Sequence, residues 1–293
     1  RKETYGKTEE IIGNWFQHKK NRKDIILASK IASKSEGLEW IRKGSKYLGF
    51  DKTNFNDAID QSLKRLKTDY IDLYQLHWPE RKVPKFGVLD FEYDSSDQDW
   101  TPIEQVLDNL QDLINSGKIR YVGLSNETPW GVMKFLEISK KRNLPRMMSI
   151  QNVYSLVNRV FDIANSEVSI RENCGLLAYS PLAGGRLSGK YLENQNPKNS
   201  RYTLWPRRFS RHHTERGEKA IKSYVNLAKN LNIKPSTFAN AFVNNRPFVT
   251  SNIIGATSMD QLKENIDSID IELSPEILKK INDIHLSDPN PCV

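Results

Sequence analysis

Six short apolar runs in this sequence each end in side chains of the kinds that an active site needs. Their last residues are Lys30, His77, Ser125-Asn126, Gln151-Asn152, Tyr179-Ser180 and Gly255-Ala256-Thr257. A lysine can hold an anion or lower the pKa of a neighbouring hydroxyl, and a neutral imidazole can donate to a carbonyl oxygen or relay a proton. Amides and hydroxyls suit a carboxamide, and an aromatic ring can stack on a flat heterocycle.

The elements that must position these residues are predicted to alternate between strands and helices. The strands are predicted at Ile25–Lys30, Tyr70–His77, Ile119–Asn126, Met147–Asn152, Leu176–Ser180 and, within the run Ile253–Thr257 and the residue before it, Asn252–Gly255. Amphipathic stretches between them include Lys7–Lys19, Asn54–Leu66 and residues 217–231 and 236–245, and a further helix is expected to start at Thr257. Such alternation predicts an α/β fold with a parallel sheet, whose site lies at the carboxyl ends of the strands.

The number of strands is smaller than a closed barrel requires. A (β/α)8 barrel needs eight strands, so six predict either an open sheet or a barrel without its first two strands. Two long irregular segments, Trp78–Trp100 and Glu193–Arg216, interrupt the alternation. Segments of this length in a compact domain are often lids or binding loops.

Composition restricts the class of protein. The 293 residues carry a net charge of +8 with a pI near 9.2, but the basic residues are scattered among acids, which favours a solvated surface over a nucleic-acid footprint. No apolar run approaches the roughly 20 residues of a membrane span. Two cysteines cannot build a zinc site or a disulfide framework, so we expect no metal and a cytoplasmic protein.

Each candidate residue also has a structural interpretation. Lys30 could extend its stem along a sheet rim, and His77 could be a buried structural histidine. The Ser125-Asn126 and Gln151-Asn152 pairs could be turn formers or helix caps. The segment from Tyr179 to Lys190 could be an ordinary loop rich in glycine and proline.

The segment after the last predicted strand has the features of an anion site. Gly255-Ala256-Thr257 opens a predicted helix, whose backbone N–H groups and dipole favour an anion. Gln261, Glu264 and Asn265 fall on or near one face of that helix and could hold an adenosine. The sequence has no GxGxxG fingerprint, Walker loop or nucleophile elbow, so any dinucleotide must bind without a Rossmann turn.

In order, several of these segments resemble the aldo-keto reductase family. The matching stretches are residues 62–77, Gly123–Asn126, Ile150–Asn152, Tyr179–Leu182 and Ile254–Thr257, followed by Gln261 and Glu264-Asn265. Residues 1–9 and 73–79 are especially similar to the bacterial Tas-type members. The resemblance implies a (β/α)8 barrel that reduces carbonyls by hydride transfer from NAD(P)H.

The resemblance also implies roles for individual residues. Lys30 and His77 match the lysine and histidine of the family's Asp-Tyr-Lys-His tetrad, in which the tyrosine donates the proton. Ser125, Asn126 and Gln151 match residues that hold the nicotinamide carboxamide, and Tyr179 matches the ring that stacks on it. The remaining positions match contacts to the pyrophosphate and adenosine: Ser180, Leu182, Lys190, Arg201, Gly255, Thr257, Gln261, Glu264 and Asn265.

The resemblance departs from the family pattern at the amino end. The tetrad aspartate and tyrosine are expected before residue 1, which predicts that about 50 residues and two strands of the barrel precede this chain. Tyr5-Gly6-Lys7-Thr8-Glu9 imitates another family pattern and makes Tyr5 an alternative proton donor. The chain by itself is therefore expected to lack reductase activity, and activity would favour Tyr5 as the proton donor.

These inferences together predict a single barrel domain over residues 1–293, containing strands three to eight of an NADP-dependent reductase. The expected substrate is a small aldehyde or ketone, with no nucleic-acid or membrane partner, and the sequence leaves the oligomeric state open. An alternative is a regulatory module that binds NADPH with little turnover, as in the potassium-channel β subunits of the family.

Overall fold

The computed structural model describes residues 2–35, 37–42, 48–205 and 210–293. These residues form two compact units. The first unit contains Arg1–Val83 and Glu92–Ile150, and the second contains Pro84–Phe91 and Gln151–Val293. Both units are α/β, and the strand pairs with a defined register within each unit are parallel, as the sequence predicted.

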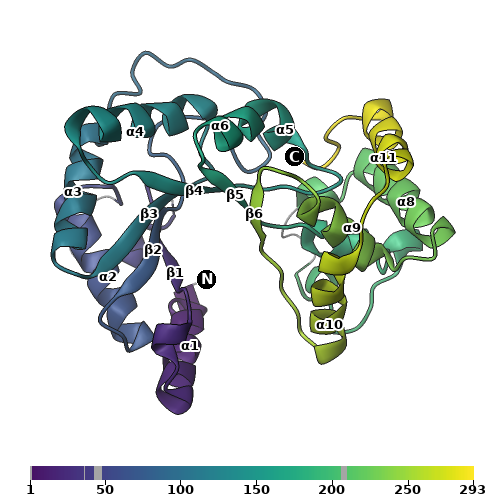
Figure 1. Ribbon diagram of the computed structural model, residues 1–293, viewed down its shortest axis with the longest axis horizontal. Helices are drawn as coiled ribbons and strands as arrows, with labels where there is room; N and C mark the ends of the chain where they lie inside the picture. Colours follow the sequence, from purple (N-terminus) through teal and green to yellow (C-terminus); the bar gives the residue numbers. More distant parts are fainter. Residues whose placement is uncertain (1, 36, 43–47, 206–209) are drawn as a thin grey trace. The chain divides into compact units, whose positions relative to one another are not determined.

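The first unit carries strands that follow one another in the sheet in chain order (Figure 1). The strands are β1 (Ala28–Ile31), β2 (Ile71–Leu76), β3 (Ile119–Ser125) and β4 (Met147–Gln151), of which Gln151 belongs to the second unit. The helices are η1 (Lys2–Thr4), α1 (Lys7–Lys19), η2 (Arg22–Asp24), η3 (Glu39–Ile41), α2 (Lys52–Leu66), α3 (Ile103–Asn115) and α4 (Pro129–Arg142).

Helix α2 illustrates how the sequence specifies these elements. Asp51 caps its first turn by accepting a hydrogen bond from the backbone N–H of Asn54 at 3.0 Å. Phe55, Ile59 and Leu66 then recur at helical spacing and are fully buried. The helix packs against α1 and against β1, so its apolar stripe covers one face of the sheet.

The second unit contains two paired strands and the remaining helices. The strands are β5 (Gly175–Ala178) and β6 (Val249–Asn252). The helices are α5 (Val160–Ala164), α6 (Ser166–Arg171), η4 (Ala183–Ser188), η5 (Leu192–Asn194), α7 (Arg201–Leu204), η6 (Ser210–His212), α8 (Glu215–Asn230), α9 (Pro235–Asn244), α10 (Met259–Asp267), η7 (Ser268–Asp270) and α11 (Pro275–Ser287). Residues 206–209 of the second predicted insertion lie outside the described residues.

The structure corrects the last predicted strand. It was expected at Asn252–Gly255, but the strand is β6, which ends at Asn252, and only the N–H of Ile253 continues the ladder by donating to the carbonyl of Ala178. Val249 aligns with Leu176 of β5, so the pairing partner rather than the apolar pair Ile253-Ile254 fixes the strand. Helix α10 likewise begins at Met259 with Ser258 as its cap, not at Thr257.

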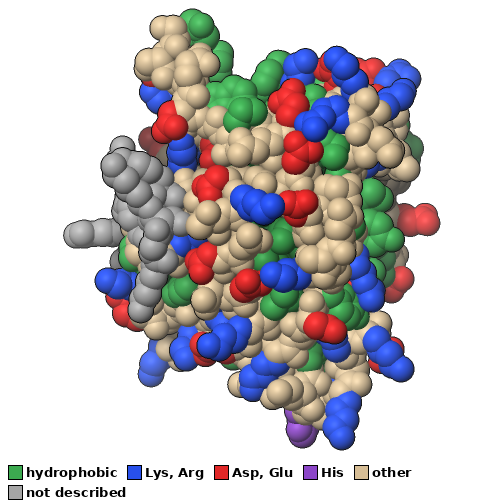
Figure 2. Space-filling model, turned by 90° about the vertical axis from the view of Figure 1, so that its left-hand side faces the viewer, with side chains coloured by type: hydrophobic (Ala, Val, Ile, Leu, Met, Phe, Trp, Pro, Cys, Tyr) green, Lys and Arg blue, Asp and Glu red, His purple; other side chains and the backbone are tan. Residues whose placement is uncertain are grey.

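The surface of the first unit shown in Figure 2 carries charges of both signs. Lys/Arg and Asp/Glu side chains alternate over this face, without one continuous patch of either sign. The first unit also has exposed ion pairs between helices or between a helix and a strand end, such as Lys52–Asp112 and Lys118–Asp60. Such pairs contribute little stability individually but leave few charges of one sign together.

Candidate functional site

One face of the first unit's strands carries the candidate catalytic residues. Successive residues of a strand point to opposite faces, so residues in register share a face with those two positions further on. Lys30 aligns with Gln75, which aligns with Gly123. His77 and Ser125 follow two residues later on the same face. Residues on the opposite face, such as Ile31 and Leu76, are buried apolar core.

Lys30 and His77 lie close enough to influence each other. The backbone N–H of His77 donates to the carbonyl of Ile31 at 3.0 Å, which sets the ends of β1 and β2 side by side. Burial lowers the pKa of the Lys30 ammonium. Burial, followed by the positive charge of Lys30, lowers the pKa of His77 to about 4. At neutral pH the imidazole is therefore uncharged and able to donate or accept one hydrogen bond.

The side chains of Lys30 and His77 have few polar partners within the described part of the first unit. Among the described residues, Lys30 has no ion pair, and the side chain of His77 has no hydrogen bond, although its ring contacts that of Trp78 at 4.5 Å. An ammonium that is partly removed from water without a carboxylate beside it is costly, and Lys30 is half-buried. Groups held in this way are candidates for proton transfer and for stabilising negative charge.

Asn126 connects the end of β3 to the end of β2. Its amide Nδ2 donates to the carbonyl of His77 at 2.8 Å and to the hydroxyl of Ser125 at 3.1 Å. Its backbone adopts a left-handed conformation (φ 54°), which asparagine tolerates better than most residues. The structure thus brings four predicted site residues, Lys30, His77, Ser125 and Asn126, together in the first unit.

A buried ion pair that the sequence analysis missed joins the segments after β2 and β3. The guanidinium of Arg81 forms a two-pronged contact with the Glu127 carboxylate, which is 3% exposed. That carboxylate also accepts from the backbone N–H of Thr128, the N-cap of α4, at 2.7 Å. Arg81 follows His77 by four positions, and Glu127 directly follows Asn126. The pair therefore fixes the spacing of the two segments that carry these site residues.

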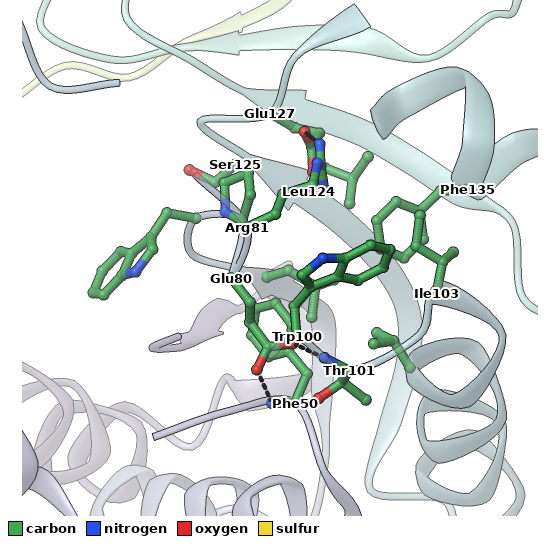
Figure 3. Close-up of a pocket in the computed structure, with 14 residues that line it drawn as sticks. Phe50, Glu80, Arg81, Trp100, Thr101, Ile103, Leu124, Ser125, Glu127 and Phe135 are labelled. Carbon is green, nitrogen blue, oxygen red and sulfur yellow. Dashed lines mark hydrogen bonds and ion pairs between the residues drawn. The ribbon is translucent and has the colours of Figure 1, made fainter. Parts of the chain in front are cut away.

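A second carboxylate, that of the half-buried Glu80, anchors the start of the long segment after β2 (Figure 3). Its two oxygens accept from the backbone N–H groups of Phe50 at 3.0 Å and Thr101 at 2.9 Å. Burial raises the pKa of Glu80, and these hydrogen bonds oppose the rise. Opposite charges that follow adjacent strand ends, as in Arg81 and Glu127, were the only sequence signal that could have indicated this framework.

Figure 3 also shows that the framework encloses a cavity. Its volume is about 20 Å³, and the lining includes Leu76, Trp100 and Ser125. A cavity of this size holds about one water molecule. It is a gap in the packing behind Ser125 and is too small for a cofactor or a substrate.

Tyr5, the alternative proton donor, lies elsewhere in the first unit. Its ring meets that of Trp40 edge-on at 5.6 Å, and the guanidinium of Arg65 lies over it at 5.0 Å. Among the described residues, no hydrogen bond or ring contact joins Tyr5 to Lys30 or His77. Tyr5 as the acid therefore gains no support from the geometry.

The second unit carries Tyr179 at the end of β5. Its backbone pairs with Asn152 and Tyr154, which follow β4 in the chain. Burial raises the pKa of its hydroxyl, while the neighbouring Arg211, which hydrogen bonds to it, opposes the rise. Gln151, the last residue of β4, is half-buried. Ser180, which follows Tyr179, takes a left-handed backbone conformation (φ 60°), and the chain then enters the glycine-containing segment.

The segment from Leu182 to Lys190 contains the short helix η4 and packs against the side chain of Tyr202. The Tyr202 hydroxyl donates to the carbonyl of Ala183 at 3.2 Å and lies 2.7 Å from Nδ1 of the buried His212. A Cβ on Gly184 would lie 2.4 Å from that hydroxyl, so glycine is required there for both space and backbone conformation. Arg201 directly precedes Tyr202, and Lys190 lies beside Gly185.

The third group of predicted residues surrounds the start of α10. Gln261 accepts from the backbone N–H of Thr257 at 3.0 Å, and Asn265 donates to the carbonyl of Gly255 at 3.2 Å. Glu264 forms an ion pair with Lys234 at 2.6 Å. These side chains stabilise the segment itself, whereas residues 254–258 are exposed.

Other classes of site leave no trace in the described residues. No cluster of three or more histidine, cysteine, aspartate or glutamate side chains there could hold a metal ion. Within the same ranges, no helix combines the length and apolar character that crossing a membrane requires.

Comparison with known proteins identifies the family. Residues 3–285 match the model of the aldo/keto reductase family. The chain is 44% identical to the Protein tas of Escherichia coli (strain K12) over 97% of its own length and 81% of that protein. It is 40% identical to an aldo-keto reductase of Babesia bovis, over 89% of this chain and 95% of that protein. A more distant relative, at 24% identity over 94% of this chain and 68% of its own length, is the aryl-alcohol dehydrogenase [NADP(+)] of Phanerodontia chrysosporium. An α/β fold of parallel strands, a polar strand-end face and these matches agree with one another, and the chain belongs to the aldo/keto reductase family.

Proposed function

We propose that this protein is an NADP(H)-linked oxidoreductase that reduces a small aldehyde or ketone to the alcohol. The observation that carries the proposal is the adjacent pair Lys30 and His77, both half-buried and both with a pKa lowered by removal from water, at the carboxyl ends of neighbouring parallel strands. Carbonyl reduction places negative charge on an oxygen, and an ammonium and an imidazole are suitable groups to stabilise it.

The roles of the two residues follow from their charge states. A neutral His77 can donate a hydrogen bond to the carbonyl oxygen of the substrate and orient it. The positive charge of Lys30 lowers the pKa of a nearby hydroxyl and makes it a better proton donor to the developing alkoxide. The family resemblance expects a tyrosine to supply this hydroxyl.

The chain also has residues suited to a dinucleotide. Ser125, Asn126 and Gln151 offer the hydroxyl and amide groups that a nicotinamide carboxamide requires, and Tyr179 offers an aromatic face. The glycine turn beside Lys190 and the exposed start of α10 suit phosphates. When bound, the nicotinamide supplies a hydride. NADP is preferred over NAD because of the family resemblance and the printed name of one relative.

A binding assay and a turnover assay test the proposal together. The full-length protein is titrated with NADPH by fluorescence, and NADPH oxidation is then followed by absorbance with aromatic and aliphatic aldehydes. We expect saturable binding and turnover of at least one aldehyde. Tight binding without turnover would instead identify a regulatory module, and failure to bind NADPH or NADH would contradict the proposal.

A further inference from the structure

Four asparagines and one serine form a closed hydrogen-bonded ring behind the start of α10. They come from β6, α9, α10 and η7, and all lie in the second unit: Asn252, Asn240, Asn244, Asn265 and Ser268. Asn240 is fully buried, and Asn265 and Ser268 are nearly so. Buried amides are stabilised by partners within the protein, so such a ring favours one arrangement of its elements, although Oδ1 of Asn252 accepts no hydrogen bond within the described residues.

The ring has a definite direction. The amide Nδ2 of Asn252 donates both its hydrogens, to Oδ1 of Asn240 at 3.2 Å and to Oδ1 of Asn244 at 3.0 Å. On one branch, Asn240 donates to Oδ1 of Asn265 at 2.9 Å. On the other, Asn244 donates to Ser268 at 3.0 Å, and Ser268 donates to the backbone carbonyl of Asn265 at 2.6 Å. Both branches therefore end on Asn265.

Asn265 passes this order to the exposed segment before α10. With its oxygen accepting from Asn240, its Nδ2 is left to donate to the carbonyl of Gly255 at 3.2 Å. A side chain at Gly255 would contact nothing within 4 Å, so packing does not hold this residue. The segment is fixed by the hydrogen bond from Asn265 and by the Gln261 bond to Thr257.

We propose that Asn240 and Asn252 are positioning residues for the adenosine-phosphate end of the dinucleotide. They touch no ligand themselves but hold Asn265, and through it Gly255 and the first turn of α10, in the arrangement that a nucleoside phosphate requires. This inference rests on the proposed function, since it assigns the 255–265 segment to the cofactor. It adds that the affinity for the cofactor depends on residues that position the 255–265 segment as well as on the residues that touch the cofactor.

The test uses adenosine 2′,5′-bisphosphate as a probe of this end of the cofactor. Binding to the full-length protein is measured by calorimetry for Asn240→Leu and for the matched control Asn245→Leu. Asn245 is the C-cap residue directly after α9, and its side chain donates to the carbonyls of Ala241 and Ile271, outside the ring. We expect Asn240→Leu to raise the Kd about tenfold and the control to leave it within about twofold.

Two further readouts separate positioning from a general loss of structure. At saturating NADPH the single-turnover rate of Asn240→Leu should match that of the wild type, because the loss is confined to binding. In Asn240→Leu, the backbone amides of residues 255–265 should exchange with deuterium faster than in the wild type, whereas those of α8 should exchange at the wild-type rate. If Asn240→Leu does not fold, Asn252→Val, which removes both donors at the head of the ring, takes its place.

The outcomes are distinguishable from a failure of the proposed function. A wild type that does not bind the bisphosphate would remove the cofactor site itself, and the positioning role with it. A wild type that binds, together with folded Asn240→Leu and Asn252→Val proteins of unchanged affinity, would overturn only the positioning role.

Discussion

The candidate catalytic residues of the first unit and the candidate cofactor residues at α10 of the second unit differ in how their side chains are bonded. In the first unit, Lys30 and His77 are half-buried at strand ends without an ion pair or side-chain hydrogen bond among the described residues. In the second, Gln261, Glu264 and Asn265 each bond to neighbours of the same unit. Unpaired buried groups suit chemistry, because their protonation can change with a ligand, whereas paired groups suit binding, because they are held in place. On the function proposed above, we therefore propose that Lys30 and His77 of the first unit act in the reaction and that the 255–265 segment of the second unit holds the adenosine-phosphate end of the cofactor.

The largest expected effect comes from removing one partner of the buried Arg81–Glu127 ion pair, which contrasts with Lys30 and His77 of the same unit, unpaired among the described residues. Arg81→Met leaves the Glu127 carboxylate buried without its partner, so we expect the free energy of unfolding to fall by about 3–5 kcal/mol. Urea denaturation at neutral pH measures it. The double variant Arg81→Met/Glu127→Leu should recover much of the loss.

Lys52→Met provides the control for this ion pair. Lys52 and Asp112 are more than half exposed, so breaking their contact should cost less than about 1 kcal/mol. An Arg81→Met protein as stable as Lys52→Met would mean that the Arg81–Glu127 pair does not hold the segments after β2 and β3.

A pH titration tests the unpaired state of His77. Its pKa is lowered to about 4 in the folded protein, so between pH 6.5 and 4 the unfolded state binds a proton that the folded state does not. Stability due to this group is therefore present above pH 6.5 and lost as the pH falls towards 4, by about 2 kcal/mol at pH 4.5. Urea unfolding of wild type and His77→Asn at pH 7 and 4.5 measures the difference. A gap between the two proteins that is the same at both pH values would show that His77 titrates normally.

The smallest expected effect concerns the glycine turn of the second unit. Gly184→Ala and Gly117→Ala impose similar backbone strain, since φ is 69° and 75°, but only the former places a Cβ against the Tyr202 hydroxyl. We expect Gly184→Ala to destabilise by about 1–2 kcal/mol more than Gly117→Ala, as measured by thermal unfolding. Equal losses would show that Tyr202 yields without cost and does not support the turn.

Local pattern was sufficient to predict much of the fold. Helix α1 begins and ends where its apolar spacing predicted, and β3 and β4 end within one residue of their expected ends. The last strand was predicted three residues too late, at Asn252–Gly255, because the apolar pair Ile253-Ile254 favours a strand more than the polar Thr250 and Ser251 do. Only pairing with β5 makes them a strand, and pairing is a tertiary property that the local sequence does not contain.

The candidate site was predicted as a set of residues but not as a framework. Strand-end position identified Lys30, His77 and Asn126, since parallel strands bring their carboxyl ends together. The contact between Arg81 and Glu127 joins residues 46 positions apart, and no local pattern connects them. The asparagine ring could not be predicted either, because the sequence spacing of asparagines in a helix such as α9 does not indicate which residues of other elements they bond to.

The most direct test of the division of roles is the single-turnover rate of hydride transfer in the full-length Lys30→Met and His77→Ala proteins, measured beside the Kd for NADPH. We predict that each substitution lowers the rate by at least about 100-fold, the scale expected of acid–base partners, and leaves the Kd within about threefold of wild type. Rates retained in both variants would contradict the assignment of chemistry to these two residues.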